Sequence, residues 1–271
     1  MASASTFQRP LTPLSSRSSS GMSDAGITFE ESANKSALSA ALHVIRTERD
    51  ALTALEDLYE TDSAAQDGLN SAVNVVSKSV GCGGKVVVSG VGKSGKIGMK
   101  IVATMNSFGI KSAFLHPTEA LHGDLGMIGE NDTMLIITFS GRTAEIHALL
   151  PYLPPGLPLI AVTSHTSHST CTLFDSRPGG HSILLPAPIP ISETLSFGVA
   201  APTTSTTVAL ALTDALAIAV ARRLHIDPSI VFQGYHPGGA IGGNHILLSN
   251  SKGIPTTNTA VADFRDSLCN A

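Results

Sequence analysis

The sequence lacks several features that would quickly assign it to a class. Tryptophan is absent, aromatic residues make up 4% and charged residues 14% of the 271 positions. The core must therefore be aliphatic. The formal net charge is −4 and no basic patch stands out, so nucleic acid is not an expected partner. No uninterrupted apolar run reaches membrane-spanning length, so a membrane is not an expected partner either.

The sequence contains only three cysteines, Cys82, Cys171 and Cys269. Their spacing is not that of metal ligands. An odd, scattered set indicates a reducing compartment rather than a disulfide framework, so we expect a cytoplasmic protein. The first residues are rich in Ser, Thr and Pro, and we expect a disordered tail over 1–36. Arg9 and Arg17 in this tail leave mitochondrial targeting open.

The stretch 86–98 organises the chain. It predicts a buried strand of β-branched residues, a Gly-x-Gly-x-x-Gly turn and the first turn of a helix. Lys93 and Ser94 then lie at the helix N-terminus, where free N–H groups and the helix dipole favour anions. The stretch therefore predicts a phosphate-bearing ligand at the carboxyl end of a parallel strand.

Other interpretations of this turn are weaker. A dinucleotide site would need an acidic residue at the end of the second strand, which instead ends Ala113-Phe-Leu-His116. A P-loop would need glycine where the chain has Val87. If this motif is taken alone, a tight strand–helix turn that binds no ligand remains an alternative interpretation.

The order of elements predicts an α/β fold. Apolar strands are expected near 86–88, 112–115, 133–138, 157–162 and 182–185. Helices are expected near 37–58, 64–80, 97–108, 145–153 and 204–224. Such alternation favours a parallel sheet covered on both faces, preceded by two helices. We expect one domain over 37–247 and a loose tail over 248–271.

A second strand–helix junction carries hydroxyls. Ser140 and Thr143 precede a helix whose first turn contains Glu145, which predicts another anion site or a plain helix cap. Beyond the second strand, His116 and His122 lie among acidic residues, and this cluster suits a metal, a sugar or a solvated loop.

Polar residues also flank the long apolar helix. Glu193 lies in a Pro-rich loop, and the run Ala201-Pro-Thr-Thr-Ser-Thr-Thr207 offers more hydroxyls, Thr204 and Ser205 among them, than one helix cap needs. His236 lies on a glycine turn, where a structural role is the alternative to a catalytic one.

These motifs occur together in one order: Gly-Val-Gly-Lys-Ser-Gly, His-Pro-x-Glu-Ala-x-His-Gly-Asp-Leu-Gly-Met, Ser-Gly-x-x-x-Glu-Ile, Ala-Pro-Thr-x-Ser-Thr-Thr and His-Pro-Gly-Gly-Ala-Ile-Gly. The chain thereby resembles the sugar isomerase (SIS) domain of the arabinose-5-phosphate isomerase family over about Leu38–Gly242. The resemblance implies a three-layer α/β/α sandwich with a five-stranded parallel, flavodoxin-like sheet. It also implies a homotetramer that interconverts D-arabinose 5-phosphate and D-ribulose 5-phosphate.

The resemblance also implies roles for residues that match the family's motifs. The catalytic positions are Lys93, Glu145, Glu193 and His236, the last reaching in from a neighbouring subunit. The substrate-binding positions are Ser94, Gly109, His116, His122, Ser140, Thr143, Thr204 and Ser205. No cofactor is required, and His116 can also bind an inhibitory zinc ion.

Several features depart from the family. Typical bacterial members continue into a pair of CBS repeats, whereas this chain stops. Arg142, the stretch 194–197 and an insertion at 174–181 differ from the usual pattern, and the first two flank the sugar. These differences therefore bear on the identity of the substrate more than on the type of reaction.

Aldose–ketose isomerisation moves a proton between C1 and C2 through an enediol. It needs a carboxylate base and a cation for the enediolate oxygen. Lys93 is suited to act as the cation. Either Glu193 or Glu145 can act as the base, and we prefer Glu193. His236 is suited to open the sugar ring or to shuttle a proton. The alternatives are a non-catalytic phosphosugar-binding regulator and an isomerase of another pentose or hexulose phosphate.

Overall fold

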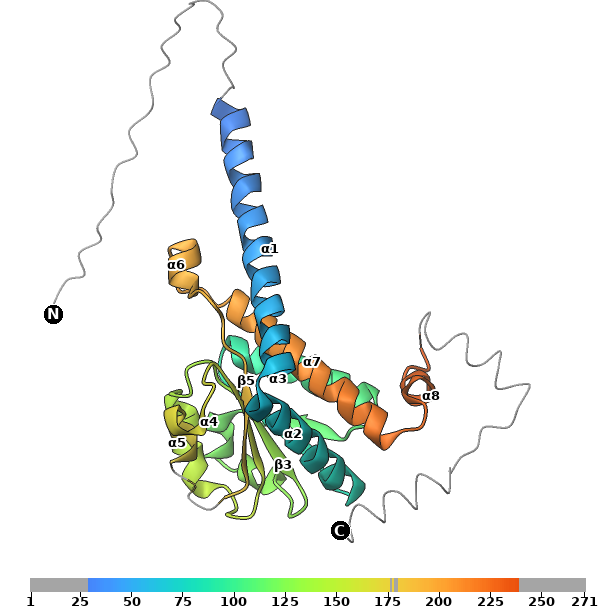
Figure 1. Cartoon of the computed structure of the whole chain (residues 1–271). Helices are drawn as coiled ribbons and strands as arrows, with labels where there is room; N and C mark the ends of the chain where they lie inside the picture. Colours follow the sequence, from blue (N-terminus) through green and yellow to red (C-terminus); the bar gives the residue numbers. More distant parts are fainter. Residues whose placement is uncertain (1–28, 176, 178–179, 239–271) are drawn as a thin grey trace, which may run out of the picture. The chain divides into compact units, whose positions relative to one another are not determined.

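The computed structural model of the chain describes residues 29–175, 177 and 180–238 (Figure 1). The chain divides into two compact units, 1–42 and 43–271. Of the first unit the structure describes the beginning of one helix, on which Leu38 and Leu42 are exposed. The predicted tail 248–271 and most of the predicted tail 1–36 lie outside the described residues. The following account concerns the second unit.

The helices and strands follow the predicted alternation. In chain order they are α1 (Phe29–Thr61), α2 (Ser63–Gly81), β1 (Val86–Ser89), α3 (Lys93–Ser107), β2 (Ser112–Phe114), α4 (Pro117–Ala120), β3 (Thr133–Ile137), α5 (Ala144–Leu149), β4 (Leu159–Thr163), β5 (Ser182–Pro186), α6 (Glu193–Phe197), α7 (Thr204–Leu224) and α8 (Pro228–Gly234). Short 3₁₀ helices cover Asp124–Met127, Leu150–Tyr152, His168–Thr170 and Thr172–Phe174.

The five strands form one parallel sheet in the order β2-β1-β3-β4-β5. In β1, Val86 lies opposite Ser112 of β2 on one side and Thr133 of β3 on the other. The chain moves outward from β1 to β2, then returns to the other side of β1 for β3. This reversal creates a switch point between β1 and β3, where open α/β sheets usually bind ligands. The expected five-stranded parallel sheet is confirmed.

Alternate strand residues bury themselves in two separate cores. Val86 and Val88 face a cluster built with α2, α3, α7 and the second-unit part of α1, whereas Val87 faces a cluster that includes α5. All four residues of β1 and all five of β3 are buried, as expected for parallel strands covered on both faces (Figure 1). The sheet is therefore the middle layer of an α/β/α sandwich.

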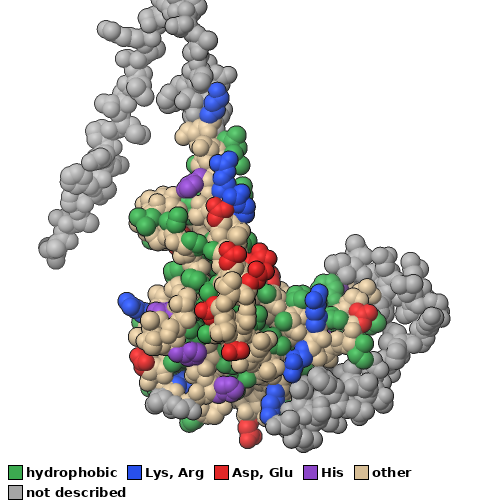
Figure 2. Space-filling model, viewed as in Figure 1, with side chains coloured by type: hydrophobic (Ala, Val, Ile, Leu, Met, Phe, Trp, Pro, Cys, Tyr) green, Lys and Arg blue, Asp and Glu red, His purple; other side chains and the backbone are tan. Residues whose placement is uncertain are grey.

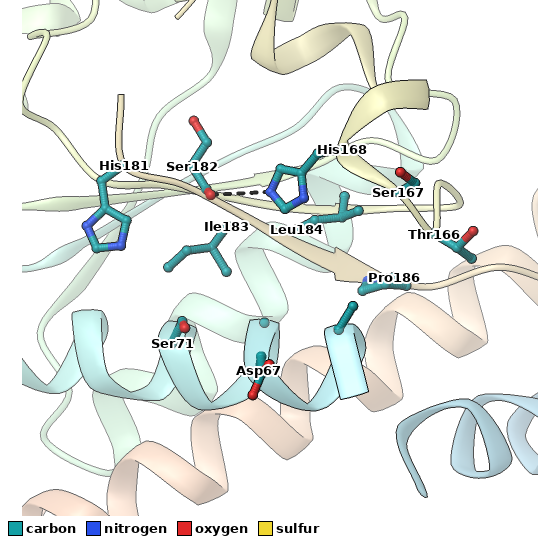
Figure 3. A pocket seen from close by; sticks show the side chains of 12 residues that line it. Asp67, Ser71, Thr166, Ser167, His168, His181, Ser182, Ile183, Leu184 and Pro186 are labelled. Atoms are coloured by element: carbon teal, nitrogen blue, oxygen red, sulfur yellow. Dashed lines mark hydrogen bonds between the residues drawn. The ribbon is translucent and has the colours of Figure 1, made fainter. Parts of the chain in front are cut away.

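The outer edge of β5 is closed by side chains instead of by another strand. His168 Nε2 lies 3.3 Å from the carbonyl oxygen of Ser182 (Figure 3). The Tyr59 hydroxyl donates a hydrogen bond to the carbonyl oxygen of Pro186 at 3.1 Å. Burial raises the pKa of Tyr59, so this phenol keeps its proton. Between these two contacts, α2 approaches Leu184 so closely that a Cβ on Gly68 would lie 2.5 Å from its carbonyl oxygen. This edge is thereby blocked against pairing with a further strand.

Several boundaries differ from the sequence-based expectation. The helix after β3 ends at Leu149 and not near 153, because Pro151 enters a 3₁₀ turn. Glu193 begins the short helix α6 and does not lie in a loop; Ser192 caps this helix and Gly198, with φ of 73°, ends it. Helix α8 was not predicted, although an Asp cap followed by proline at its start was a readable signal.

Helix α7 is a core helix. It is long and apolar enough to cross a membrane by length and composition, and 56% of the relevant window is buried within the chain. Eleven of its residues are buried, while Ile218 on the other side is 39% exposed. Packing against α2 and α3 therefore accounts for most of its apolar character.

The surface carries charges of both signs. On the face shown in Figure 2, basic and acidic side chains are interspersed with apolar ones. Cys171 is a free, buried thiol, whereas Cys82 is disulfide-bonded. One disulfide does not make a disulfide-stabilised fold. It nevertheless differs from the fully reduced cysteines that the sequence pattern predicted.

The entry to β1 gives a stability prediction. A Cβ on Gly84 would lie 2.1 Å from the carbonyl oxygen of Asn131, which is backbone and cannot yield by rotating. We expect Gly84→Ala to lower the free energy of unfolding by about 3 kcal/mol, the upper end of overpacking costs, in denaturant titration. Gly156→Ala is the matched control, since nothing lies within 4 Å of its Cβ. Equal stability of the two variants would contradict this packing.

Candidate active site

The candidate site lies at the carboxyl ends of the strands, next to the switch point. Helix α3 leaves β1 toward one face of the sheet, and α5 leaves β3 toward the other. The loops that precede them therefore diverge and leave room between them. The glycine turn after β1 fits closely here: a Cβ on Gly95 would lie 2.8 Å from the carbonyl oxygen of Gly90, and Gly92 has φ of 61°.

A pocket of about 410 Å³ opens at this edge. It brings together four of the predicted residues, Lys93, Ser94, Glu193 and Ser205, with apolar residues from the ends of β3 and β4. The first turns of both α3 and α7 contribute to its wall. Two long helices thus direct their N-terminal ends at one pocket, which favours an anion there.

Glu193 is fixed in this pocket by the start of α7. It is only 9% exposed, and its Oε1 accepts from Thr203 N at 3.1 Å and from Ser205 N at 3.0 Å. The Ser205 hydroxyl donates to the same oxygen at 2.5 Å. Since one carboxylate oxygen takes all three bonds, the other oxygen, Oε2, has no protein partner in the described part of the chain. The carboxylate therefore has a defined orientation and one oxygen available to a ligand.

The lysine of the pocket differs from the glutamate in exposure. Lys93 is exposed at the first position of α3, whose N-cap Gly92 provides no side-chain hydrogen bond. Ser94 is partly buried beside it. An ammonium group, a hydroxyl and uncapped helix N–H groups at one place form a donor set for an oxyanion.

The Ser-Gly loop after β3 lies beside the pocket. Phe139 lines the pocket, whereas Ser140, Thr143 and Glu145 lie outside its lining. The Thr143 hydroxyl is 2.8 Å from that of Thr138, so it does not cap α5. Helix α5 has six residues, and so its dipole is weaker than the sequence suggested. What this loop offers a ligand is mainly its hydroxyls.

The two loop histidines follow β2, on the far side of β1. His116 caps α4, because its Nδ1 accepts from Thr118 N at 3.3 Å, and His122 is exposed. Within the described ranges no group of three His, Cys, Asp or Glu side chains could hold a metal ion. A zinc ion at His116 would therefore need ligands from elsewhere.

Three further predicted residues also lie outside the pocket lining. Thr204 is buried beside Ser205, and its hydroxyl has no hydrogen-bond partner among the described residues. His236 lies at the opposite end of α3, where its Nδ1 is 2.6 Å from the Phe232 carbonyl oxygen. Gly109 is at that end too, since a Cβ on it would lie 3.1 Å from Tyr235.

Two other histidines of the site were not predicted. His147 Nε2 bonds the carbonyl oxygen of Gly141 at 2.8 Å, and His165 Nε2 bonds that of Ser140 at 3.0 Å. Both therefore hold the Ser-Gly loop. A single histidine that bonds a backbone carbonyl has no spacing signal in the sequence, and only the fold brings these residues to the loop.

Comparisons with known proteins agree with the motifs. The SIS domain family matches residues 81–219, about half of the chain, so this chain belongs to the SIS domain family. It is 38% identical over 198 residues to arabinose 5-phosphate isomerase KpsF of Escherichia coli O6:H1 (strain CFT073), covering 70% of this chain and 58% of that protein. Arabinose 5-phosphate isomerase KdsD of Salmonella typhi is 40% identical over 197 residues, covering 70% and 57%.

A solved structure is similar as well. The E. coli CFT073 protein c3406 in complex with arabinose 5-phosphate is 35% identical, with a TM-score of 0.59 over 75% of this chain and 99% of that one. The chain spans only about three fifths of the length of the curated relatives that it matches.

The anchoring of Glu193 gives a second stability prediction. Glu193→Ala would leave three donors of Thr203 and Ser205, the two of Ser205 buried, without their acceptor, whereas Glu193→Gln keeps an acceptor oxygen in place. We expect the alanine variant to lose about 1–3 kcal/mol of unfolding free energy and the glutamine variant clearly less, measured by denaturant titration. An alanine variant as stable as the glutamine variant would show that the carboxylate does not hold the start of α7.

Proposed function

We propose that the chain is an aldose–ketose isomerase of a sugar phosphate, which interconverts D-arabinose 5-phosphate and D-ribulose 5-phosphate. The observation that carries this proposal is the pocket in which Lys93 and the buried, oriented Glu193 face one cavity at the carboxyl ends of the strands. Relatives named arabinose 5-phosphate isomerase and the sugar phosphate complex of a similar structure support the choice of substrate.

In this proposal Glu193 and Lys93 have different roles in the reaction. The Oε2 oxygen of Glu193 removes the C2 proton of the open-chain aldose, and the electron pair of that bond forms the C1–C2 double bond of an enediolate. The ammonium group of Lys93 stabilises the negative oxygen that develops at C1. Transfer of the O2 hydroxyl proton to O1 moves the negative charge to O2, and return of the abstracted proton to C1 then forms the C2 carbonyl of the ketose. Glu193 suits the base better than Glu145, because Glu145 is exposed and outside the pocket.

The phosphate belongs at the two hydroxyl-bearing loops in this proposal. Ser94 offers a hydroxyl beside Lys93 at the start of α3. In the neighbouring loop, the Ser140 hydroxyl oxygen accepts from Arg142 N at 3.2 Å, so its own proton remains available to an anion. The reaction transfers a proton and changes no net oxidation state, so it needs no redox cofactor.

His236 enters the proposal through assembly. Lys93 begins α3 and Ser107 ends it, and His236 Nε2 lies 3.5 Å from the Ser107 hydroxyl. A helix rises about 1.5 Å per residue, which separates the two ends by about 20 Å. His236 can therefore serve only a neighbour's pocket in this arrangement, and we propose a homotetramer in which it does so.

The role of Lys93 gives a kinetic prediction. We expect Lys93→Ala to lower kcat/KM for D-arabinose 5-phosphate by about 10²–10³-fold, the effect of removing one donor from a developing oxyanion. Lys96→Ala is the matched control, because Lys96 is exposed one turn further along α3 and outside the pocket. The measurement is turnover of C5 to C7 sugar phosphates.

Two outcomes would count against the proposal. Faster turnover of another pentose or hexulose phosphate would reassign the substrate. Binding of sugar phosphates without any turnover would favour a regulatory protein that binds phosphosugars.

The role of His236 gives a complementation prediction. If Lys93 and His236 of one site come from different chains, inactive Lys93→Ala and His236→Ala proteins should regain part of the activity when co-assembled. Random mixing leaves some sites with both native residues. Activity is measured after joint refolding, with hybrid assemblies verified by mass spectrometry. Hybrids that form and remain inactive would place His236 outside the neighbour's site.

A further inference from the structure

The Ser-Gly loop after β3 is held in place through its carbonyl groups. The Phe139 carbonyl oxygen accepts from Ser164 N at 2.9 Å, from Ser164 Oγ at 2.7 Å and from Thr163 Oγ1 at 3.0 Å. His165 forms a hydrogen bond with the carbonyl oxygen of the next residue, Ser140. His147 forms one with the carbonyl oxygen of Gly141, which follows Ser140. Three successive carbonyl oxygens of one loop are thus all engaged.

The two histidines come from the side of the loop away from the pocket, whereas Thr163, which bonds the Phe139 carbonyl, lines the pocket. His147 lies on α5, which packs on the face of the sheet opposite α3 and α7. His165 follows β4 and precedes the 3₁₀ turns whose Cys171 and Leu173 are buried on that same face. Carbonyl oxygens turned to this side are removed from the pocket that α3 and α7 line.

His165 is itself fixed closely against the loop. Its Nδ1 lies 3.0 Å from the Thr170 hydroxyl, so both ring nitrogens have partners. Gly141 adopts φ of 65°, and a Cβ there would lie 3.2 Å from His165 Nε2. The imidazole therefore fits directly beneath the left-handed residue of the loop.

The consequence is electrostatic. A carbonyl oxygen that turned toward a bound phosphate would repel it, whereas a hydroxyl or N–H group attracts it. With the Ser140 and Gly141 carbonyls held by the two histidines, the loop presents the Ser140 hydroxyl as a donor, because that oxygen already accepts from Arg142 N.

We propose that His165 and His147 are positioning residues that preorganise the Ser-Gly loop for the phosphate of the substrate. This inference rests on the proposed function, in which Ser140 binds that phosphate. Neither imidazole touches the substrate. Each acts by fixing a carbonyl oxygen away from it, so the effect should appear in phosphate binding and not in proton transfer.

Two replacements of His165 separate its hydrogen bonds. The amide nitrogen of His165→Gln can occupy the place of Nε2 and donate to the Ser140 carbonyl, whereas that of His165→Asn reaches only the place of Nδ1. We expect His165→Asn and His147→Ala to raise KM for the sugar phosphate about fivefold to tenfold, as loss of one hydrogen bond does, with kcat within about twofold. The inhibition constant of inorganic phosphate should rise by the same factor, and His165→Gln should restore both values.

The matched control is His168→Asn. His168 lies three residues further along and bonds Ser182 at the pocket on the β5 edge, away from the Ser-Gly loop (Figure 3). We expect its KM and phosphate inhibition constant to equal those of the unchanged chain. Thermal unfolding of every variant shows whether a kinetic change merely reflects loss of structure.

The outcomes separate this inference from the function on which it rests. If Ser140→Ala raises KM and the phosphate inhibition constant while His165→Asn changes neither, the positioning role is wrong and the phosphate site stands. If Ser140→Ala changes neither value, the phosphate site itself is wrong. A fall in kcat at constant KM for His165→Asn, or no recovery in His165→Gln, would also overturn the positioning role.

Discussion

The reversal of strand order between β1 and β3 is the constraint on which the rest of the site depends. It sends α3 and α5 to opposite faces of the sheet, so the loops before them separate where the strands end. The turn after β1 has little freedom, because a Cβ on Gly90 would lie 3.1 Å from the Ile137 carbonyl oxygen of β3. The pocket is thus a product of topology and close backbone packing, and its polar residues are attached to a frame that already exists.

Two long helices, α3 and α7, hold the pocket rigidly. α3 and α7 pack on each other and on the sheet within one core, and both begin at the pocket. Glu193 ties the short helix α6 to the start of α7 through three hydrogen bonds. A shift of α7 would therefore move the carboxylate relative to Lys93, so catalytic geometry and core packing are linked.

Much of the fold could be predicted from the sequence, because the strands are apolar, β-branched runs bounded by turn residues. Lys93 and Glu193 were expected as site residues from the family resemblance, and they line one pocket because parallel strands place their carboxyl ends at one edge. The short helices α6 and α8 were missed because capping signals, not periodicity, define them. His147 and His165 were missed because their role depends on carbonyl groups that only the folded loop brings near. Linear motifs identify residue types and leave their distances open.

The separation of motif residues along α3 restricts how copies of the chain can assemble if the proposed roles hold. Gly109 and His236 gather near the end of α3, about 20 Å from the Lys93 pocket by helix rise. One chain then carries a pocket and a separate completing patch. A two-fold interface that places the patch of each chain over the pocket of the other completes two sites at once, because such an interface is reciprocal. Exposed apolar residues on and beside α8, Ile226, Ile230 and Tyr235, border that patch and would be covered by the same contact. Assembly and catalysis would then depend on the same short segment after α7.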